Sequence, residues 1–511
     1  MPLKVLVGTY NVNTQEIDQD LSSWLFPLNG FSDSSANTST TTLVNKPDII
    51  ALGFQEFIPL PHSLLATDTE RLDHCANLIE RTIFLNTKES YTQLVKASYV
   101  GLVLFIYTRD RSITGLIQSY EISTAGVGLF WIGNKGGLGA RIVLNQESVT
   151  DWREIDGRNI NDENMSENEL VLCFVVAHLA PHSHNTQRRN QDFRNICERL
   201  IFTNSEQQYI LRQEEEIIVN DESLSEDGST NTPLIPRNQF KDNQKNNKMD
   251  SLACCKDREY FTIYDSDFLF FFGDLNYRIE LDEQLPQIHR NALGNRNNIS
   301  LHSTNHLTVE KLLNLLHENQ HIRLRNHDQL TREVKSGKVL NGFEEGELNF
   351  LPTYKFHRGS EHEFDAVKKI PGWCDRIFYF WHKEGDDNTK REVPIKLNYY
   401  ISHPSYTLSD HKPVSAFFTI PTLSSVPLIS PTSHDQLDSF RVITEKRPRT
   451  FNSPFTVDRN IRTKFIIGEM AAKVSGSVWW VFGTRQGIEV CLMSSVTLVI
   501  VWWMVKKFYD I

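Results

Sequence analysis

The feature that most constrains the fold of this chain is a series of short apolar runs, each with the length of a buried β-strand. Helix-like stretches, such as residues 72–85 and 187–208, lie between these runs. Because strand and helix patterns alternate along the chain, we predict an α/β fold. The apolar runs occupy residues 5–7, 49–52, 102–107, 140–144, 171–177, 268–272, 377–380 and 414–418.

The length of 511 residues is compatible with one large domain that carries surface insertions, and we expect residues 1–420 to form it. Polar stretches at about residues 29–45, 146–168 and 204–251 are predicted to be mobile insertions. The formal net charge of -11 argues against a basic nucleic-acid-binding face, so we predict no nucleic-acid partner. The 7 cysteines are scattered without CxxC spacing, which is typical of thiols in the cytosol.

The C-terminal part has a different character. Residues 421–486 begin Ser/Pro-rich and continue with many Lys and Arg residues, which predicts a linker. Val490 to Val505 carries no charged side chain, and as a helix it spans about 24 Å, close to the thickness of a thin bilayer. We predict a C-terminal transmembrane helix over residues 487–507, with a buried helix as the alternative. The N-terminus lacks the apolar stretch of a secretory signal, so we expect the preceding domain to be cytoplasmic.

Polar residues that can bind or move ions and protons stand at or next to the ends of the apolar runs. Oxygen donors dominate among them, and oxygen ligands without cysteine favour Mg²⁺ over zinc, with Glu56 as the anionic anchor. Asp274 and Asn276 are alternate residues, which project to one side if the backbone stays extended. The set comprises Asn11, Asn13, Glu56, His178, His182, Asp274, Asn276, Asp375, Arg376, Asp410 and His411.

Two familiar types of site fit this pattern poorly. His178 and His182 have the spacing of a helical zinc pair, but Pro181 lies between them. Ser409, Asp410 and His411 are consecutive, whereas the members of a hydrolase triad act from separate elements.

Glycine-rich and basic segments supply features suited to phosphate. Asn134 and Lys135 lie among glycines at residues 133–137, where backbone amides can approach an anion without the spacing of a nucleotide P-loop. Further positive charge for a polyanionic substrate is predicted from Tyr354-Lys355, Lys368, Lys369 and Arg376, although single lysines of this kind are often ordinary surface charge.

These residues fall into blocks that resemble the inositol polyphosphate 5-phosphatases over residues 4 to about 420. The resemblance implies a two-sheet β-sandwich flanked by helices, of the DNase I-like endonuclease-exonuclease-phosphatase type. The blocks, in order, are TYNVN (9–13), FQEF (54–57), GNKGGLGAR (133–141), HLAPH with RNQD (178–192), GDLNYRI (273–279), FLPTYK (350–355), PGWCDRI (371–377) and SDHKPV (409–414).

The same resemblance implies roles for individual side chains. Glu56, with Asn11 close by, matches the Mg²⁺ ligands, and Asp274 matches the residue that activates water. His411, oriented by Asp375 or Asp410, matches the group that stabilises the transition state. Asn276 and His178 match phosphate-binding groups. Substrate-binding positions are matched by Asn134, Lys135, Arg189, Asn190 and Arg376, and those that read a neighbouring 4-phosphate by Tyr354, Lys355 and Lys368 or Lys369.

The sequence hypothesis is therefore Mg²⁺-dependent hydrolysis of the 5-phosphate of phosphatidylinositol 4,5-bisphosphate by direct attack of water. A cysteine-based phosphatase is the less favoured chemistry, because Cys374 lies in a block whose Asp and Arg carry the family role. The architecture is similar to that of tail-anchored fungal members at the endoplasmic reticulum membrane, with the catalytic domain in the cytoplasm, and we expect a monomer. The alternatives are a soluble inositol-phosphate 5-phosphatase, a non-catalytic phosphoinositide-binding tether and, third, a nuclease.

Overall fold

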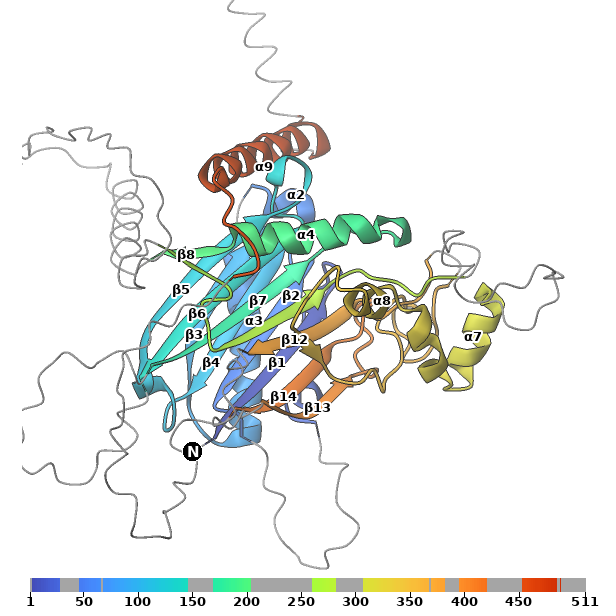
Figure 1. Ribbon diagram of the computed structural model, residues 1–511, viewed down its shortest axis with the longest axis horizontal. Helices are drawn as coiled ribbons and strands as arrows, with labels where there is room; N and C mark the ends of the chain where they lie inside the picture. The colour runs from blue at the N-terminus through green and yellow to red at the C-terminus, as the bar shows by residue number, and fades with distance from the viewer. Residues whose placement is uncertain are drawn as a thin grey trace, which may run out of the picture.

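Two six-stranded β-sheets form the centre of the molecule, with helices on their outer faces (Figure 1). The computed structural model describes residues 2–27, 46–65, 68–145, 169–203, 260–281, 307–366, 369–381, 395–420, 453–484 and 488. The predicted insertions at 29–45, 146–168 and 204–251 lie outside these residues. The two-sheet architecture predicted from the sequence blocks is confirmed.

The first sheet has the strand order β13-β14-β1-β2-β4-β3. Within it β1 pairs in parallel with β2 and antiparallel with β14. The bounds are β1 Leu3–Asn11, β2 Ile49–Gln55, β3 Tyr91–Tyr99, β4 Leu102–Arg109, β13 Lys396–Ser402 and β14 Val414–Ile420.

The second sheet has the order β11-β12-β10-β7-β6-β5. Its central strand β10 pairs in parallel with β7 and antiparallel with β12, so this sheet is also mixed. The bounds are β5 Ile117–Gly126, β6 Gly136–Asn145, β7 Glu169–His178, β10 Phe268–Asp274, β11 Glu344–Glu345 and β12 Asp375–Trp381.

The main core lies between the two sheets. Phe270 of β10 meets Phe418 of β14, with ring centroids 5.0 Å apart. At Gly53 the sheets approach so closely that a Cβ atom would lie 2.5 Å from the Val176 side chain. Removal of these apolar surfaces from water is the main stabilising contribution, and it makes the sandwich a rigid support for residues at its edges.

Helices cover both outer faces. The long helix α3 packs against the first sheet, and α4 packs against the second. The prediction of a helix over residues 187–208 is wrong at its C-terminal end: α4 stops at Arg199, and the β-branched and aromatic residues that follow form β8 (Ile201–Thr203), paired with β9 (Tyr260–Thr262). The α-helices are α1 Ser22–Leu25, α2 Leu60–Ser63, α3 Thr69–Thr87, α4 Thr186–Arg199, α7 Val309–His317, α8 Gln329–Lys335 and α9 Ile461–Gly483, and the short 3₁₀ turns are η1 Thr114–Leu116, η2 Leu129–Trp131, η5 Ser183–Asn185 and η8 His321–His327.

Helix α9 changes the interpretation of the segment 421–486, which the sequence predicted to be a linker throughout. Residues Ile461–Gly483 contain no proline and form a helix that packs on α2 and η2. Within the described residues, no helix has both the length and the apolar character needed to span a bilayer. The predicted membrane helix at 487–507 lies outside them, apart from Ile488.

Candidate active site

The strand pairings bring the predicted catalytic residues to one edge of the sandwich. Asp274 ends β10 and is paired in register with His178, the last residue of β7. On its other side it is paired with Asp375, the first residue of the antiparallel strand β12. Asn11 ends β1 in the facing sheet, and its Nδ2 donates to Asp274 Oδ2 at 2.9 Å. Residues far apart in sequence therefore meet in one buried cluster.

Asp274 is the centre of this cluster. Its Oδ2 lies 3.3 Å from His178 Nε2 and 3.9 Å from His411 Nε2. Burial raises the pKa of the Asp274 carboxyl, but His411 and His178 outweigh it and hold that pKa well below its usual range. Asp274 is thus an ionised acceptor at neutral pH.

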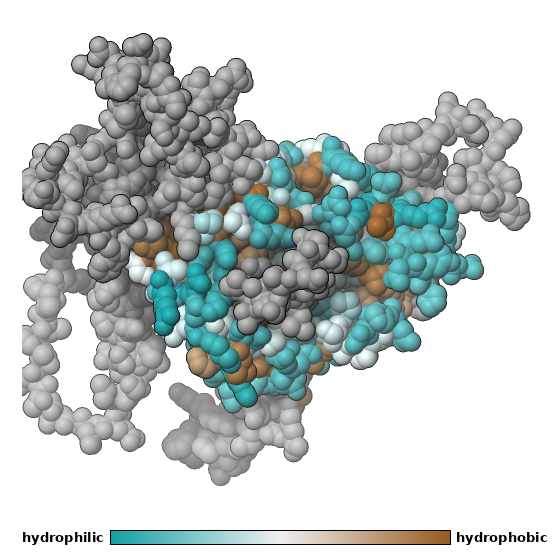
Figure 2. All heavy atoms as spheres, turned by 90° about the horizontal axis from the view of Figure 1, so that it is seen from below, coloured by the Kyte–Doolittle hydropathy of each residue, from teal (hydrophilic) through white to brown (hydrophobic). Residues whose placement is uncertain are grey.

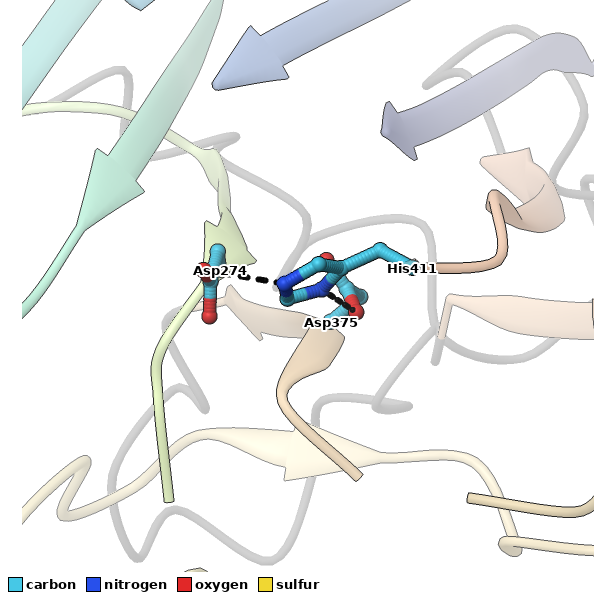
Figure 3. Close-up of side chains that lie close together, drawn as sticks. All are labelled: Asp274, Asp375 and His411. Atoms are coloured by element: carbon cyan, nitrogen blue, oxygen red, sulfur yellow. Dashed lines mark hydrogen bonds and ion pairs between the residues drawn. The ribbon is translucent and has the colours of Figure 1, made fainter. Parts of the chain in front are cut away.

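His411 is held between two carboxylates, and Figure 3 shows its ring between Asp274 and Asp375. His411 Nδ1 lies 2.8 Å from Asp375 Oδ2, and the same carboxylate oxygen accepts from Thr353 Oγ1 at 2.7 Å. Burial lowers the pKa of His411, but Asp375 and Asp274 more than compensate and raise it to about 9. At neutral pH His411 is an imidazolium whose Nε2 lies 3.9 Å from Asp274 Oδ2.

The backbone conformation just before Asp274 requires a glycine. Gly273 has φ +141°, and a Cβ atom there would lie 2.0 Å from the carbonyl oxygen of Ala177. Asn276 follows with φ 59°, its amide N–H donates to Asp274 Oδ1 at 3.0 Å, and its Nδ2 donates to the Leu179 carbonyl oxygen at 3.2 Å. The sequence predicts an extended backbone here, but the backbone turns and fixes Asn276 beside Asp274.

Glu56 and Asn11 were predicted to hold a metal ion. Glu56 directly follows Gln55, the register partner of Asn11, and its side chain is 41% exposed. The same His178 Nε2 that lies 3.3 Å from Asp274 lies 3.7 Å from Glu56 Oε1, so two carboxylates converge on one point. The carboxylate oxygens of Glu56 and Asp274 form a donor set that fits a hard divalent cation such as Mg²⁺. The Asn11 side chain lies beside them, with Nδ2 on Asp274 and Oδ1 accepting from the Asn13 N–H.

A second group of side chains has the composition of a metal site. Among the described residues, Asp274, Asp375 and His411 can place one ligand atom each within 4.8 Å of one another. The hydrogen bond between Asp375 and His411 already occupies one ligand atom of each. This group therefore fits a carboxylate–histidine pair for proton and charge chemistry better than a metal centre.

Lys135 approaches the cluster from the glycine-rich segment. Its Nζ contacts the His178 ring, and burial lowers its pKa although Glu56 and Asp274 act to raise it. His178 itself has a lowered pKa, because burial and the Lys135 charge both disfavour the imidazolium. The neighbouring Asn134 is packed tightly against Gly128, where a Cβ atom would lie 2.1 Å from Asn134 Oδ1.

Basic and aromatic side chains line the other side of the cluster. The Tyr354 ring lies between the His411 ring, at 4.5 Å, and the Arg278 guanidinium, at 4.0 Å. Lys355 Nζ pairs with Asp410 Oδ2 at 3.0 Å, and Asp410 Oδ1 also accepts from Asn13 Nδ2 at 2.7 Å. Asp410 therefore contacts Lys355 and Asn13, and it is Asp375 that orients His411.

The sequence predicts that Lys368 or Lys369 binds a neighbouring phosphate. Lys369 Nζ lies 3.2 Å from His182 Nδ1 in an exposed position, and Lys368 lies outside the described residues.

Arg189, Asn190 and Arg376 do not reach the cluster with their polar ends. The Arg189 guanidinium is fully buried and donates to the Ala180 and His182 carbonyl oxygens and to Gln329 Oε1. Asn190 bonds to Glu333 and Tyr277. These contacts support the surrounding loops and differ from the substrate contacts that the sequence predicted.

The position of Arg376 in β12 explains why its guanidinium lies away from the cluster. It follows Asp375 in β12, and successive residues of a strand point to opposite sides. Its guanidinium is fully buried, donates to both Glu345 carboxylate oxygens, and pairs with Asp328 Oδ2 at 2.9 Å. Arg376 is thus part of a buried ion-pair network, and its role here is structural.

Two residues of the cluster were not singled out from the sequence. Arg278 donates to Asn276 Oδ1 and stacks on Tyr354, and Thr353 anchors Asp375. Both lie inside the recognised blocks GDLNYRI and FLPTYK, so their position in a block was the only available signal.

Proteins named as inositol phosphatases are among those similar to this chain. The chain is 27% identical over 420 residues to mouse Type II inositol 1,4,5-trisphosphate 5-phosphatase, a match that covers 82% of the chain and 30% of the relative. It is 25% identical over 419 residues to Polyphosphatidylinositol phosphatase INP53 of Saccharomyces cerevisiae, covering 81% of the chain and 26% of that protein. The chain therefore matches less than a third of the length of these curated relatives.

A solved structure shows the same fold. The inositol polyphosphate 5-phosphatase domain of SPsynaptojanin, in complex with inositol (1,4)-bisphosphate and a calcium ion, matches with a TM-score of 0.52 and 23% identity over 82% of this chain and 84% of that one. The matches confirm the resemblance to inositol polyphosphate 5-phosphatases. The model of the Endonuclease/Exonuclease/phosphatase family 2 matches residues 8–417, and the chain belongs to this family.

Proposed function

We propose that this protein is a Mg²⁺-dependent phosphatase that hydrolyses the 5-phosphate of phosphatidylinositol 4,5-bisphosphate by direct attack of water. The observation that carries the proposal is the cluster of Asp274, His411 and Asp375, with Glu56 and Asn11 beside it. This arrangement supplies an ionised carboxylate, a charged imidazole and an oxygen-rich cation site within a few ångströms.

Each side chain has a part that its contacts support. The Asp274 carboxylate accepts a hydrogen bond from the attacking water and orients it, since its strongly lowered pKa makes it an acceptor. The Nε2–H of charged His411 donates to the phosphoryl oxygen on which negative charge develops, while Asp375 holds Nδ1. Asn276, fixed by Asp274 and Leu179, offers a further polar group to the phosphate.

Glu56 and Asn11, next to Asp274, would hold the Mg²⁺ ion. A bound divalent cation supplies neutralisation of phosphate charge and polarises the phosphoryl group. The Glu56 and Asp274 carboxylates lie 3.7 and 3.3 Å from the same His178 Nε2, so two oxygen ligands of the kind that divalent cations prefer stand together, which supports a cation at this place.

Substrate recognition follows from the basic side of the cluster. Lys355, Arg278 and Tyr354 lie together next to His411, where a phosphate adjacent to the scissile one would meet positive charge. The names of the matched relatives include an inositol 1,4,5-trisphosphate 5-phosphatase and a polyphosphatidylinositol phosphatase. A headgroup phosphorylated at positions 4 and 5 is the substrate class that agrees with both.

The lipid form of this headgroup is favoured by the sequence after α9. Its uncharged stretch from Val490 to Val505 has the composition of a membrane anchor, and an anchored enzyme meets its substrate at high effective concentration. We place the enzyme at the cytoplasmic face of the endoplasmic reticulum membrane, as a monomer.

Phosphate release by the full chain tests the proposal. We expect Mg²⁺-dependent release from inositol 1,4,5-trisphosphate and from vesicles that contain phosphatidylinositol 4,5-bisphosphate, and none from DNA. Asp274→Asn should reduce the rate by about a thousandfold or more, as loss of a central catalytic group does. Asp110→Asn, which changes an exposed carboxylate after β4, is the matched control and should be silent. Binding of the headgroup without any release would contradict catalysis and favour a tether.

A further inference from the structure

Helix α9 packs on the domain through its smallest residues. Gly468, Ala472 and Gly476 recur every fourth position and are the residues of α9 that are buried. A Cβ atom at Gly468 would lie 2.6 Å from the Trp131 carbonyl oxygen, and one at Gly476 would lie 2.9 Å from the Leu65 side chain. The helix backbone therefore rests directly on η2 and on the end of α2.

The outer face of α9 is apolar. Ile466, Ile467, Met470, Val474 and Val478 are between 38% and 62% exposed. Met470 and Val474 are each two residues from a member of the small stripe, about 200° around the helix, so they point away from the domain. A surface helix normally buries its large apolar residues and exposes its polar ones. Here the order is reversed, which indicates a partner that is itself apolar.

The apolar character of this face of α9 differs from that of the face seen in Figure 2. Figure 1 shows α9 at the top of the molecule, and Figure 2 shows the molecule from below, where the described surface is mostly hydrophilic with scattered hydrophobic residues. Isolated exposed apolar residues, such as the scattered ones in Figure 2, need no partner.

The two elements under α9 lead directly into the active site. η2 precedes the segment of Lys135, and α2 follows that of Glu56. The contact between the Lys464 ammonium and the Trp131 ring, at 5.6 Å, and that between the Trp479 and His62 rings, at 5.1 Å, fix α9 to both elements. A surface bound by α9 would therefore lie beside the loops that carry the cation and phosphate groups.

We propose that the outer face of α9 lies in the interface of a phospholipid bilayer and holds the active-site loops at the lipid surface. The inference rests on the proposed action on a membrane lipid. Two observations favour lipid over another protein as the occupant. Arg459, Arg462 and Lys473 are exposed on or next to α9, which suits anionic headgroups. The chain also continues after a few residues into the uncharged stretch from Val490 to Val505, so both apolar segments belong next to the same membrane.

The test compares two substrates for the full chain reconstituted in vesicles of phosphatidylcholine and phosphatidylserine. The double variant Met470→Asp/Val474→Asp should lower hydrolysis of vesicle-borne phosphatidylinositol 4,5-bisphosphate by about tenfold, because two carboxylates then face the acyl boundary. It should leave hydrolysis of soluble inositol 1,4,5-trisphosphate unchanged. Met470→Leu/Val474→Leu and Ser475→Asp, the latter exposed but turned about 100° from Val474, are the controls and should match the parent.

Unchanged vesicle hydrolysis in the double Asp variant would overturn the proposal. Equal losses on both substrates would also overturn it, because α9 would then only support the loops. A parent that releases phosphate from neither substrate refutes the proposed function instead, and a second measurement then decides the role of α9.

That measurement uses a fluorescent label on Val474→Cys, with Ser475→Cys as its control, after Cys254, Cys255 and Cys491 are changed to Ser. The label at position 474 should be shielded from aqueous iodide in the vesicles, and the label at position 475 should be quenched more strongly. Equal quenching would refute burial in lipid. If the shielding disappears when the protein is diluted into excess lipid, a second copy of the chain covers the outer face of α9. That result would also refute burial in lipid.

Discussion

Substitution of Asp375 by Asn should move the pH dependence of the enzyme through His411. The 2.8 Å contact between Asp375 Oδ2 and His411 Nδ1 is the strongest attraction that keeps the imidazole charged in its buried position. The pKa of His411 lies at about 9 instead of 6.5, and this difference corresponds to about 3 kcal/mol at about 1.4 kcal/mol per pKa unit. Asn accepts the same hydrogen bond without the charge, so geometry is kept while most of this stabilisation is lost.

The activity lost in Asp375→Asn should increase as the pH rises. The active imidazolium is present below the pKa and is lost as pH rises through it. If the pKa returns to 6.5, the charged fraction at pH 8 falls from about 90% to about 3%, a loss of roughly thirtyfold, whereas at pH 6 the loss is under about twofold. Burial acts to lower the pKa below 6.5, whereas Asp274, which stays 3.9 Å from His411 Nε2, acts to raise it, so 6.5 lies between the two effects.

The assay is initial-rate hydrolysis of inositol 1,4,5-trisphosphate between about pH 5.5 and 9.5 at saturating Mg²⁺. We expect the alkaline limb of kcat to move to lower pH by two or more units in Asp375→Asn. Thr353→Val, which removes the 2.7 Å hydrogen bond to the same carboxylate oxygen, should move it in the same direction by less, and Thr353→Ser should not move it. A uniform loss across the pH range would refute the assignment of Asp375 to the charge state of His411.

Four further substitutions test separate parts of the structure. Glu56→Gln should lower kcat by about a hundredfold or more and raise the Mg²⁺ concentration needed for half-maximal rate, with an unchanged Tm. Cys374→Ser should keep kcat within about twofold in the phosphate-release assay, because burial raises the pKa of this thiol well above its usual range and leaves it inert. Gly273→Ala should destabilise the protein by about 4 kcal/mol or more in denaturant unfolding, since φ +141° and the Ala177 carbonyl oxygen exclude a Cβ atom. Arg376→Met should cost about 3–5 kcal/mol of unfolding free energy, because Glu345 and Asp328 are left buried and unpaired, and a normal Tm with a raised KM would restore the substrate-binding role.

The strands predicted from the sequence are those inside the sheets. Every predicted apolar run falls within β1, β2, β4, β6, β7, β10, β12 or β14, which have neighbours on both sides. In the two large sheets, the strands missed are the edges β3, β5, β11 and β13, and the separate short pair β8 and β9 was missed as well. An edge strand such as β3 is covered on fewer sides: only Val95 is fully buried and several of its side chains are polar, so an apolar-run criterion does not find it.

The composition of the candidate site was predictable, but its inner geometry was not. Asp274, His178 and Asp375 end or begin interior strands, and paired strands bring such ends together. Whether a further predicted residue faces the site depends on the direction of its side chain. Arg376 points away from its neighbour Asp375, and Arg189 is held by loop carbonyl groups. A sequence block shows that residues belong to one site, but only the fold separates those that face the cleft from those that support it.

His178 and His411 differ in charge because each lies next to a different charged residue. His178 and His411 both place Nε2 near the same oxygen of Asp274, at 3.3 and 3.9 Å, and both are buried. Burial alone would keep both neutral. Lys135 next to His178 adds to that tendency, whereas Asp375 next to His411 reverses it. One carboxylate is thereby flanked by a neutral imidazole on the side of Glu56, where a cation is to be bound, and by a charged imidazole on the side of Tyr354, where phosphate charge is to be stabilised. Exchange of the charges at Lys135 and Asp375 should therefore exchange the protonation states of the two histidines and abolish turnover, although Asp274, His178 and His411 are unchanged.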